Sequence, residues 1–346
     1  MRERIRIYIA ACLYYSGLVR LGLWWRQRSG RHLIILNYHR AAGNLRAQLD
    51  YLRRHYRIMH LEDALQEFYG PDGQGKQGND RRIPLVLTFD DGYQDNYSYA
   101  FPLVRTLQVP MTIFVIPGYV ESGEYFWWLA AEKLVKSVKI DTVIFEGQTY
   151  HPAETEDRRS LTKAIDTCLR YATSVAEREE RLAQIQQSLG VALPRRGYGN
   201  GDESSLPITW EQMREMEESG WVSFGAHTVH HPILAYLADA TEAQREVTES
   251  RRLLEQKLGH PVATFAYPVG RDQHIGGQGV QAVQAAGFKW AVTTLEGENT
   301  RQTDPYLLNR APGDIELHWL VMAAELVGLL GIVSRFRKKY EKFVGR

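Results

Sequence analysis

Short apolar runs alternate with amphipathic stretches along most of this chain. Runs typical of strands buried on both faces lie at 33–38, 84–89 and 111–116. Apolar residues at helical spacing occur at 45–55, 61–69 and 96–107, and a short strand pattern lies at 57–59. Repeated strand–helix units of this kind predict a parallel sheet covered by helices.

The alternation stops near residue 121 and resumes near residue 206. Between these points the chain has charged helical patterns, notably at 158–189, which indicate an insertion. Capping patterns at Thr209 and Thr241 then begin new helices. Later elements are expected as strands at 263–266 and 290–293 and a helix near 279–286. One α/β barrel with a helical insertion accommodates the 346 residues, and 44% hydrophobic content supports a large core.

Two adjacent carboxylates, Asp90 and Asp91, follow the apolar run at 84–89. An isolated Asp-Asp-Gly is typical of a solvated turn, because Asp and Gly tolerate the dihedral angles of turns. Adjacent side chains at a strand end diverge, however, so the two carboxylates can serve different purposes. Because active sites of parallel barrels lie at the carboxyl ends of strands, this position favours a catalytic role for the two carboxylates.

A histidine pair downstream supports that interpretation. His227 and His231 are spaced i, i+4 after the strand-like stretch at 221–225, with His230 between them as a competing candidate. Two imidazoles and one carboxylate can bind a divalent ion and leave coordination positions open, as catalytic zinc sites do. The other carboxylate is then free to act as a general base.

These motifs resemble the NodB-homology polysaccharide deacetylases, also called carbohydrate esterase family 4, over approximately residues 33–310. The family's Thr-Phe-Asp-Asp-Gly motif is present, and the resemblance implies a catalytic base at Asp90 and a metal ligand at Asp91. The His-Ser/Thr-x-x-His motif implies metal ligands at His227 and His231, with Thr228 in the hydroxyl position. The implied fold is the distorted (β/α) barrel of the polysaccharide deacetylase type.

The third family motif, usually Arg-Pro-Pro-Tyr-Gly, departs from the pattern here. Ala266 replaces an arginine that orients the base, and Val269 replaces a tyrosine whose backbone amide helps to hold the oxyanion. A backbone N–H survives at Val269, whereas the arginine must come from elsewhere. Arg310 is the candidate substitute, although an ordinary surface arginine is an equal alternative. Tyr267, Val269 and Arg310 are thus the candidate substrate-binding or oxyanion-binding residues.

A proton donor for the leaving amine is also required. His318 is the histidine nearest the usual C-terminal position, but it begins an apolar, basic-flanked tail. In a circularly permuted branch, resembling the poly-N-acetylglucosamine deacetylases, this histidine lies on the first strand. His39, which ends the strand at 33–38, is therefore expected to be the general acid.

The resemblance implies a metal-dependent hydrolase that removes N-acetyl groups from amino sugars of a polysaccharide or a lipid-linked glycan precursor. Zinc is the expected metal, although cobalt, nickel and manganese suit the same ligands. Two alternatives stay open: a deacetylase or deformylase of a small or nucleotide-linked amide, and a catalytically silent binding module of a membrane glycan assembly.

Charge is distributed unevenly along the chain. The net charge is +1, but residues 1–31 carry +6 and residues 335–346 carry +5, which leaves −10 between them. An acidic body disfavours nucleic acid as a partner. Cys12 and Cys168 match no metal or redox spacing and are expected to be reduced.

The basic ends flank apolar segments at 7–19 and 319–333, each too short or too interrupted for the roughly 20 residues of a spanning helix. We expect a basic apolar N-terminal helix at 1–31, a deacetylase barrel at 32–314 with the insertion at about 121–206, and an apolar then polybasic C-terminal helix at 315–346. Helices of this composition suit an anionic membrane surface. With no cleavage site after the first apolar run, the expected location is the cytoplasmic face of the inner membrane.

Overall fold

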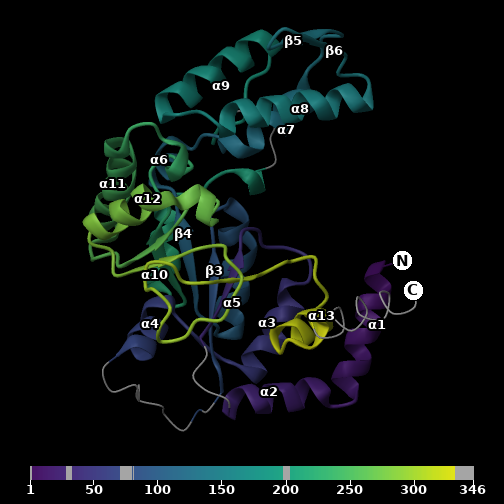
Figure 1. Cartoon of the computed structure of the whole chain (residues 1–346), viewed down its shortest axis with the longest axis vertical. Coiled ribbons are helices and arrows are strands. Elements are labelled where there is room, and N and C mark those ends of the chain that lie inside the picture. Colours follow the sequence, from purple (N-terminus) through teal and green to yellow (C-terminus); the bar gives the residue numbers. More distant parts are fainter. Residues whose placement is uncertain (1, 29–32, 71–79, 81, 198–202, 332–346) are drawn as a thin grey trace, which may run out of the picture.

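An eight-stranded parallel sheet forms the centre of the computed structural model, which describes residues 2–28, 33–70, 80, 82–197 and 203–331 (Figure 1). The strand order is β10-β1-β3-β4-β7-β8-β9, and β2 pairs with the first part of β3. The strands are β1 (Ile34–Tyr38), β2 (Arg57–Met59), β3 (Pro84–Phe89), β4 (Met111–Val115), β7 (Val222–Ala226), β8 (Thr264–Ala266), β9 (Trp290–Val292) and β10 (Ala311–Pro312). Most of their residues are buried because both faces of the sheet are covered.

The segment 308–312 joins the two ends of this sheet. Leu308 makes a parallel bridge to Val292, the last residue of β9, and the Leu308 N–H donates to the Ala291 carbonyl over 3.0 Å. A few residues later β10 pairs with β1, with Ala311 opposite Leu36. One short segment therefore contacts both β9 and β1, which confirms the predicted distorted barrel and places Arg310 at the point of closure.

Helices between the strands cover the barrel, as the alternating pattern predicts. They are α3 (Leu45–His55), α4 (Leu61–Tyr69), α5 (Phe101–Leu107), α6 (Pro117–Ser122), α10 (Trp210–Glu218), α11 (Ala240–Leu258) and α12 (Asp272–Ala285). The helix expected at 96–107 begins instead with a π-helical turn at Asn96–Ala100, directly after the Asp90–Asp91 turn. Turns of this kind often occur at functional sites.

Helix α10 begins as its sequence predicts, and α11 begins differently. The Thr209 hydroxyl accepts a hydrogen bond from the Gln212 N–H, and the Gln212 side chain accepts one from the Thr209 N–H, which makes a complete capping box. The predicted cap at Thr241 is wrong. Asp239 caps α11 instead, and its carboxylate accepts the Thr241 N–H because a carboxylate is the stronger acceptor.

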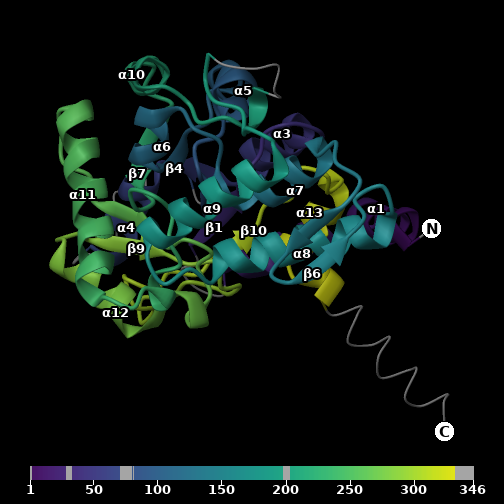
Figure 2. The ribbon, with the colours of Figure 1, turned by 90° about the horizontal axis from the view of Figure 1, so that it is seen from above.

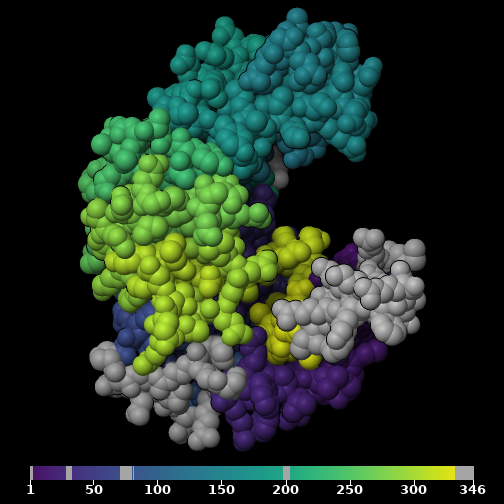
Figure 3. Space-filling view, in the orientation of Figure 1, coloured from purple at the N-terminus to yellow at the C-terminus, as the bar shows by residue number. Residues whose placement is uncertain are grey.

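The expected insertion forms a layer at one end of the barrel (Figures 1 and 2). It contains α7 (Trp127–Ser137), the hairpin of β5 (Val143–Phe145) and β6 (Gln148–Tyr150), α8 (Thr155–Arg170) and α9 (Val175–Leu189). Its apolar side chains form a separate core, which includes Phe126, Trp127 and Leu161. In the space-filling view this layer projects beyond the barrel (Figure 3).

The N-terminal segment forms two helices rather than the single one expected, α1 (Arg2–Tyr15) and α2 (Leu18–Arg28). They meet at 68°, and Gly17 between them has a positive φ of 84°. Among the described residues no single helix is long and apolar enough to cross a membrane, although this bent pair meets the length and composition criteria together. Helix α13 (Trp319–Leu326) packs against α1. The polybasic residues 335–346 lie outside the described residues.

Candidate active site

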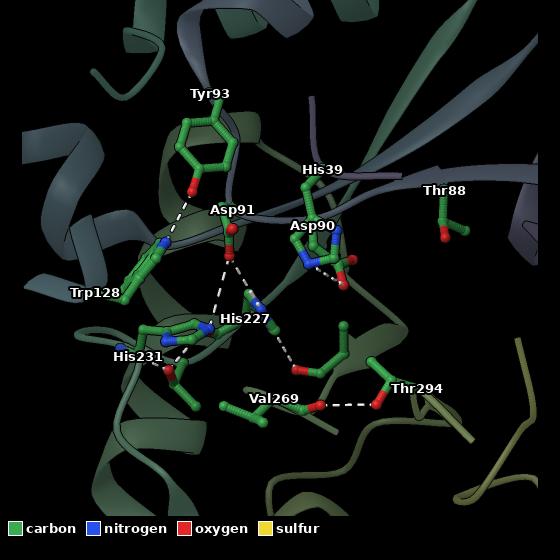
Figure 4. A network of polar contacts seen from close by, with 12 residues as sticks. His39, Thr88, Asp90, Asp91, Tyr93, Trp128, His227, His231, Val269 and Thr294 are labelled. Carbon is green, nitrogen blue, oxygen red and sulfur yellow. Dashed lines mark hydrogen bonds and ion pairs between the residues drawn. The ribbon is translucent and has the colours of Figure 1, made fainter. Parts of the chain in front are cut away.

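The predicted chemical residues meet at the carboxyl ends of the parallel strands (Figure 4). His39 follows β1, Asp90 and Asp91 follow β3, and His227 follows β7. Parallel strands in register end at one edge of the sheet, so residues distant in sequence become neighbours there. The sheet therefore brings together all five residues expected to supply the base, the acid and the metal ligands, including His231 one turn further on.

Asp91, His227 and His231 form a buried group that could hold a metal ion. Asp91 Oδ1 lies 3.4 Å from His227 Nε2 and 3.7 Å from His231 Nε2, and the three potential ligand atoms all lie within 4.8 Å of one another. A tetrahedral zinc ion bound at about 2.0–2.1 Å needs ligand atoms roughly 3.3 Å apart. The residues present thus fit a divalent ion, with positions left open beyond the three ligands.

Local hydrogen bonds fix the His227 imidazole and the backbone that carries both histidines. His227 Nδ1 lies 2.7 Å from the Ala266 carbonyl oxygen, so Nε2 is left facing Asp91. The Thr228 hydroxyl accepts a hydrogen bond from the His231 N–H over 2.9 Å and donates one to the His227 carbonyl. A hydroxyl in the second position of the motif therefore ties the two histidines together, which gives a physical reason for the Ser/Thr of that motif.

The backbone of the site is strained. Six non-glycine residues of the described chain have positive φ, and four of them, Asp91, Thr228, His231 and Val269, lie in the expected motifs. A β-branched residue such as Val269, at φ 61°, rarely adopts this conformation. Strain of this kind persists where surrounding contacts over-determine the backbone, and it gathers at functional sites.

His230 points away from this group. Its Nδ1 lies 2.7 Å from Glu246 Oε1, and its N–H and that of Val229 both donate to Glu246 Oε2. Glu246 is buried in α11 and anchors the turn between the two histidines. The competing histidine is therefore part of the support of the loop and lies outside the potential metal group.

The insertion supports the same turn from its other side. Trp127 Nε1 donates to the His231 carbonyl over 3.1 Å, and Arg178 Nη2 donates to the His230 carbonyl over 3.0 Å. The Arg178 side chain is only 3% exposed and its guanidinium lies over the Trp127 ring. No local sequence signal marks this role of Arg178, because the carbonyl that it binds in this turn is more than 50 positions away.

Asp90 makes a buried ion pair with Arg310. Nη1 donates to Oδ1 and Nη2 to Oδ2, both over 2.7 Å, and both side chains are almost fully buried. Arg310 also donates through Nε to the Thr293 carbonyl over 2.6 Å and through Nη1 to the Thr88 hydroxyl over 3.1 Å. All four hydrogen bonds of the Arg310 guanidinium are therefore to groups of the chain itself, and the Arg310 side chain has no exposed surface.

The charges of the site are set by burial and by these partners. Burial raises the pKa of Asp90, but the charge and hydrogen bonds of Arg310 outweigh it, and the net pKa lies below its usual value. Burial, together with nearby His227 and Arg178, lowers the pKa of His231 well below its usual value. The site therefore favours an ionised Asp90 and a neutral His231, which is the form that binds metal.

His39 lies beside Asp90 on the solvent side. Its Nε2 is 3.9 Å from Asp90 Oδ2, and half of its side chain is exposed (Figure 4). Asn96, in the π-helical turn, donates from Nδ2 to the His39 carbonyl over 3.0 Å, which fixes the end of β1. The arrangement leaves the imidazole free to exchange protons with water or with a bound group.

Of the two candidate residues in the third motif, Val269 lies near the site and Tyr267 lies in the core. Among the described residues no hydrogen bond uses the Val269 N–H, whereas its carbonyl accepts the Thr294 hydroxyl over 2.7 Å (Figure 4). Tyr267 instead packs edge-on against Phe265 in the core shared with Phe288, and its buried hydroxyl has no partner among the described residues. The structure does not bring the Tyr267 ring to the carboxylates.

Aromatic residues form one wall of the site. Trp128 packs against His231 with ring centroids 4.2 Å apart, and its Nε1 donates to the Tyr93 hydroxyl over 2.8 Å (Figure 4). Trp128 is half-buried, whereas Phe126 and Trp127 of the same aromatic cluster lie in the insertion core. Sequence reasoning did not single out Tyr93, although it follows Asp-Asp-Gly directly.

Two solved structures have a fold similar to that of this chain. The chain resembles the Streptococcus pyogenes deacetylase PplD in complex with acetate, with a TM-score of 0.54 and 18% identity over 84% of this chain and 96% of that one. It resembles IcaB from Ammonifex degensii with a TM-score of 0.54 and 19% identity, over 85% of this chain and 97% of that one. At these identities the likeness establishes the fold, and it agrees with the expected deacetylase barrel.

Sequence comparison establishes the family. The putative polysaccharide deacetylase YxkH of Bacillus subtilis (strain 168) is 22% identical over 292 residues, which cover 83% of this chain and 73% of that protein. The family model described as polysaccharide deacetylase matches residues 77–291, more than half of the chain. The matched range contains Asp90, Asp91, His227 and His231. The chain therefore belongs to the polysaccharide deacetylase family, as its motifs predict.

Proposed function

We propose that this protein is a metal-dependent N-deacetylase that removes acetyl groups from amino sugars of a polysaccharide or a lipid-linked glycan precursor. Acetate and a free amine are the products. The observation that carries the proposal is the division of labour between two adjacent carboxylates. Asp90 is ion-paired with a buried arginine, while Asp91 faces two imidazole nitrogens at the spacing of metal ligands.

Asp91, His227 and His231 would hold the divalent ion, with zinc as the expected metal. When bound, such an ion supplies Lewis-acid polarisation of the substrate's amide carbonyl. The chain itself supplies the orientation of the ligands, through the Ala266 carbonyl and the Thr228 hydroxyl. Because His231 is kept neutral by burial, it can bind a metal without first losing a proton at neutral pH.

Asp90 would act as the general base. It is ionised at neutral pH and accepts a proton from the water that attacks the acetyl carbon. Arg310 would hold the carboxylate in place, since its two terminal nitrogens bind both carboxylate oxygens and its Nε is fixed by Thr293. We assign Arg310 to positioning the base rather than to contacting substrate, because its side chain is not exposed.

His39 would donate the proton that the leaving amine requires. Breaking the C–N bond expels a strongly basic nitrogen unless that nitrogen is protonated, and imidazole can supply the proton at neutral pH. The exposed position of His39 next to Asp90 suits this role. As the acyl carbon becomes tetrahedral, its oxygen gains negative charge. The Val269 N–H, which has no hydrogen-bond partner among the described residues, would donate to it.

An N-acetylated glycan is the substrate class best supported. Family membership supports it, and a further solved structure with this fold is a de-N-acetylase from Aggregatibacter actinomycetemcomitans, with a TM-score of 0.53 and 14% identity. The half-buried ring of Trp128 at the edge of the site offers an apolar face of the kind that sugar rings pack against.

Acetate release tests this proposal. Purified full-length protein, with its metal content measured, is incubated with free, polymeric and lipid-linked N-acetyl sugars and with small and nucleotide-linked amides. We expect acetate from at least one glycan and little from the small amides. Release only from small or nucleotide-linked amides would replace the proposed substrate class. No release from any substrate by fully metal-loaded protein would favour a silent binding module.

A further inference from the structure

The N-terminal helices expose an unusual share of the large apolar side chains. Eleven such side chains are exposed among the described residues, and seven of them lie between residues 5 and 25. These seven are Ile5, Tyr8, Tyr15, Leu18, Leu21, Trp24 and Trp25. Single exposed apolar residues are normal on a protein surface, but a concentration of this kind marks an interaction site.

The exposed residues of α2 form one face of that helix. Leu18, Leu21 and Trp25 follow at spacings of three and four, so they lie on one side, with Trp24 beside them. The opposite side carries Val19 and Leu23, which are buried. Helix α2 is thus apolar on two faces, of which the barrel covers only one.

Helix α1 continues the pattern across the bend. Ile5, Tyr8, Cys12 and Tyr15 are exposed at helical spacing, while Ala10 on the other side is fully buried. Tyr15 and Leu18 flank the bend at Gly17, so the exposed residues of the two helices are continuous along the chain. We call these outward residues the outer stripe.

Arginines border the outer stripe. Arg4 on α1 and Arg20 and Arg28 on α2 are exposed, and none of them forms an ion pair with another described residue. The Arg28 guanidinium lies 4.2 Å above the Trp24 ring, so charge and aromatic surface occur together. Residues 1–31 carry +6 in a chain of net charge +1. Apolar and aromatic side chains bordered by arginines are the composition that anionic lipid surfaces bind.

Other contacts hold the helix pair against the barrel. Arg6 forms an ion pair with Glu325 of α13 at 2.5 Å, and Arg26 pairs with Glu298 and donates to the Leu326 carbonyl. Tyr14 of α1 packs edge-on against Trp319 with ring centroids 5.1 Å apart. A bilayer-spanning arrangement would break these contacts and carry arginines into hydrocarbon, whereas binding to a surface breaks none.

We propose that the outer stripe of α1 and α2 docks the protein on an anionic lipid bilayer, with both helices in the headgroup region and the barrel outside it. Trp and Tyr suit that depth because their rings are amphipathic, and the bordering arginines reach lipid phosphates. This surface is separate from the proposed catalytic residues, so docking and acetate release can succeed or fail independently. The cytoplasmic side of the inner membrane stays a prediction.

Vesicle flotation of the full-length protein tests the proposal. We expect binding to phosphatidylcholine vesicles that contain phosphatidylglycerol, weak binding to pure phosphatidylcholine, and release by high salt. The variant Leu21→Ser/Trp25→Ser should lower the partition by roughly tenfold or more, because it removes two inserted side chains. Arg20→Gln/Arg28→Gln should weaken binding to the anionic vesicles alone. Each variant is compared with wild type by thermal unfolding, so that loss of fold is not read as loss of docking.

The matched control is Ile144→Ser/Tyr171→Ser, which removes two equally exposed apolar side chains from the insertion. It should leave vesicle binding unchanged. Equal binding of the control and the α2 variant, or no binding of the wild type, would overturn the proposal. Sedimentation without lipid provides the competing outcome: if Leu21→Ser/Trp25→Ser dissociates a dimer and leaves vesicle binding intact, the stripe binds a second copy of this chain instead.

Cys12 permits a separate measurement on α1. With Cys168 replaced by serine, a polarity-sensitive fluorophore can be attached to Cys12, which is exposed within the outer stripe. Its emission should shift to shorter wavelength on anionic vesicles, while the same label on an Ile144→Cys protein that lacks both natural cysteines should not respond. Unchanged emission at Cys12 would overturn the proposal for α1.

Discussion

Arg310 and Asp90 form a two-point ion pair across the barrel although 220 positions separate them in the sequence. The arginine lies in the segment that closes the sheet between β9 and β1, and the aspartate directly follows β3. At the position where the third motif usually has an arginine, this chain has Ala266. In the structure a guanidinium from the segment just before β10 binds Asp90 instead.

Replacing Arg310 by methionine should impair the base. Burial then raises the pKa of Asp90 without the opposing charge and hydrogen bonds of Arg310, so the carboxylate binds a proton at higher pH. The acidic limb of the pH profile of kcat/KM should move to higher pH, and the rate near neutral pH should fall roughly 10²-fold, the lower end for a general base. Arg214→Met, on the exposed surface of α10, is the control and should change neither quantity.

The Arg310→Met variant also measures how far an unpaired buried charge lowers the free energy of unfolding. Removing one partner of a buried ion pair costs about 3–5 kcal/mol of the free energy of unfolding. The double variant Arg310→Met/Asp90→Asn should recover part of that loss, because no lone charge is left. Additive effects in this double-mutant cycle would show that the two residues do not interact energetically.

Thr228 should govern metal affinity through its hydroxyl. Thr228→Val keeps the shape but removes the hydrogen bonds to the His231 N–H and the His227 carbonyl, so the ligands lose their common support. We expect zinc affinity to fall by about 10- to 100-fold, as it does for other groups that orient metal ligands. Thr228→Ser retains the hydroxyl and should restore affinity. Competition titration with a zinc indicator measures both, and equal affinities for Val and Ser would refute the role.

Arg178, a residue of the insertion, should stabilise the turn between His227 and His231, which we call the metal turn. Arg178→Met removes a donor from the His230 carbonyl but keeps most of the aliphatic stem that packs on Trp127. We expect a loss of about 1 kcal/mol in the free energy of unfolding and weaker zinc binding, because the partly buried His230 carbonyl loses this donor. Arg170→Met, on a partly exposed helix of the insertion, is the control. Zinc affinity that stays at the wild-type value would limit Arg178 to a structural role.

His39→Ala should slow the reaction according to the leaving group. For an N-acetyl amide the rate should fall roughly 10²-fold or more, since the amine departs without a proton donor. For an activated aryl acetate the fall should be much smaller, because a nitrophenolate leaves unprotonated. Metal content should not change, since His39 is outside the ligand group. An equal loss on both substrates would remove the proton-donor assignment.

The parts of this fold that local pattern dictates were predictable from the sequence. The helices at 45–55 and 61–69 and the strand at 57–59 have the predicted bounds because their apolar spacing is regular. The π-helical turn at Asn96–Ala100 and the bend at Gly17 were missed, since each interrupts a pattern that reads as continuous. Periodicity reports which face is buried but not where a backbone changes its path.

The residues of the candidate site were likewise only partly predictable from the sequence. The motifs predicted Asp90, Asp91, His227 and His231 as one group, because they follow strands whose ends lie at one edge of the sheet. Glu246 and Arg178 could not be found this way, since their hydrogen bonds to the metal turn depend on how α11 and the insertion pack around it. The resemblance also suggested Tyr267, whose ring follows the strand alternation into the core with Phe265.

The decisive measurement for Asp90 as the general base is acetate release by the Asp90→Asn variant. Wild type and variant are loaded with zinc, their bound metal is measured, and both are assayed on the best N-acetylated glycan. Asp90→Asn should retain zinc, because Asp91 and the two histidines would hold it, while acetate release should fall by roughly 10²-fold or more. Wild-type rates of acetate release from a zinc-loaded Asp90→Asn variant would show that Asp90 is not the general base.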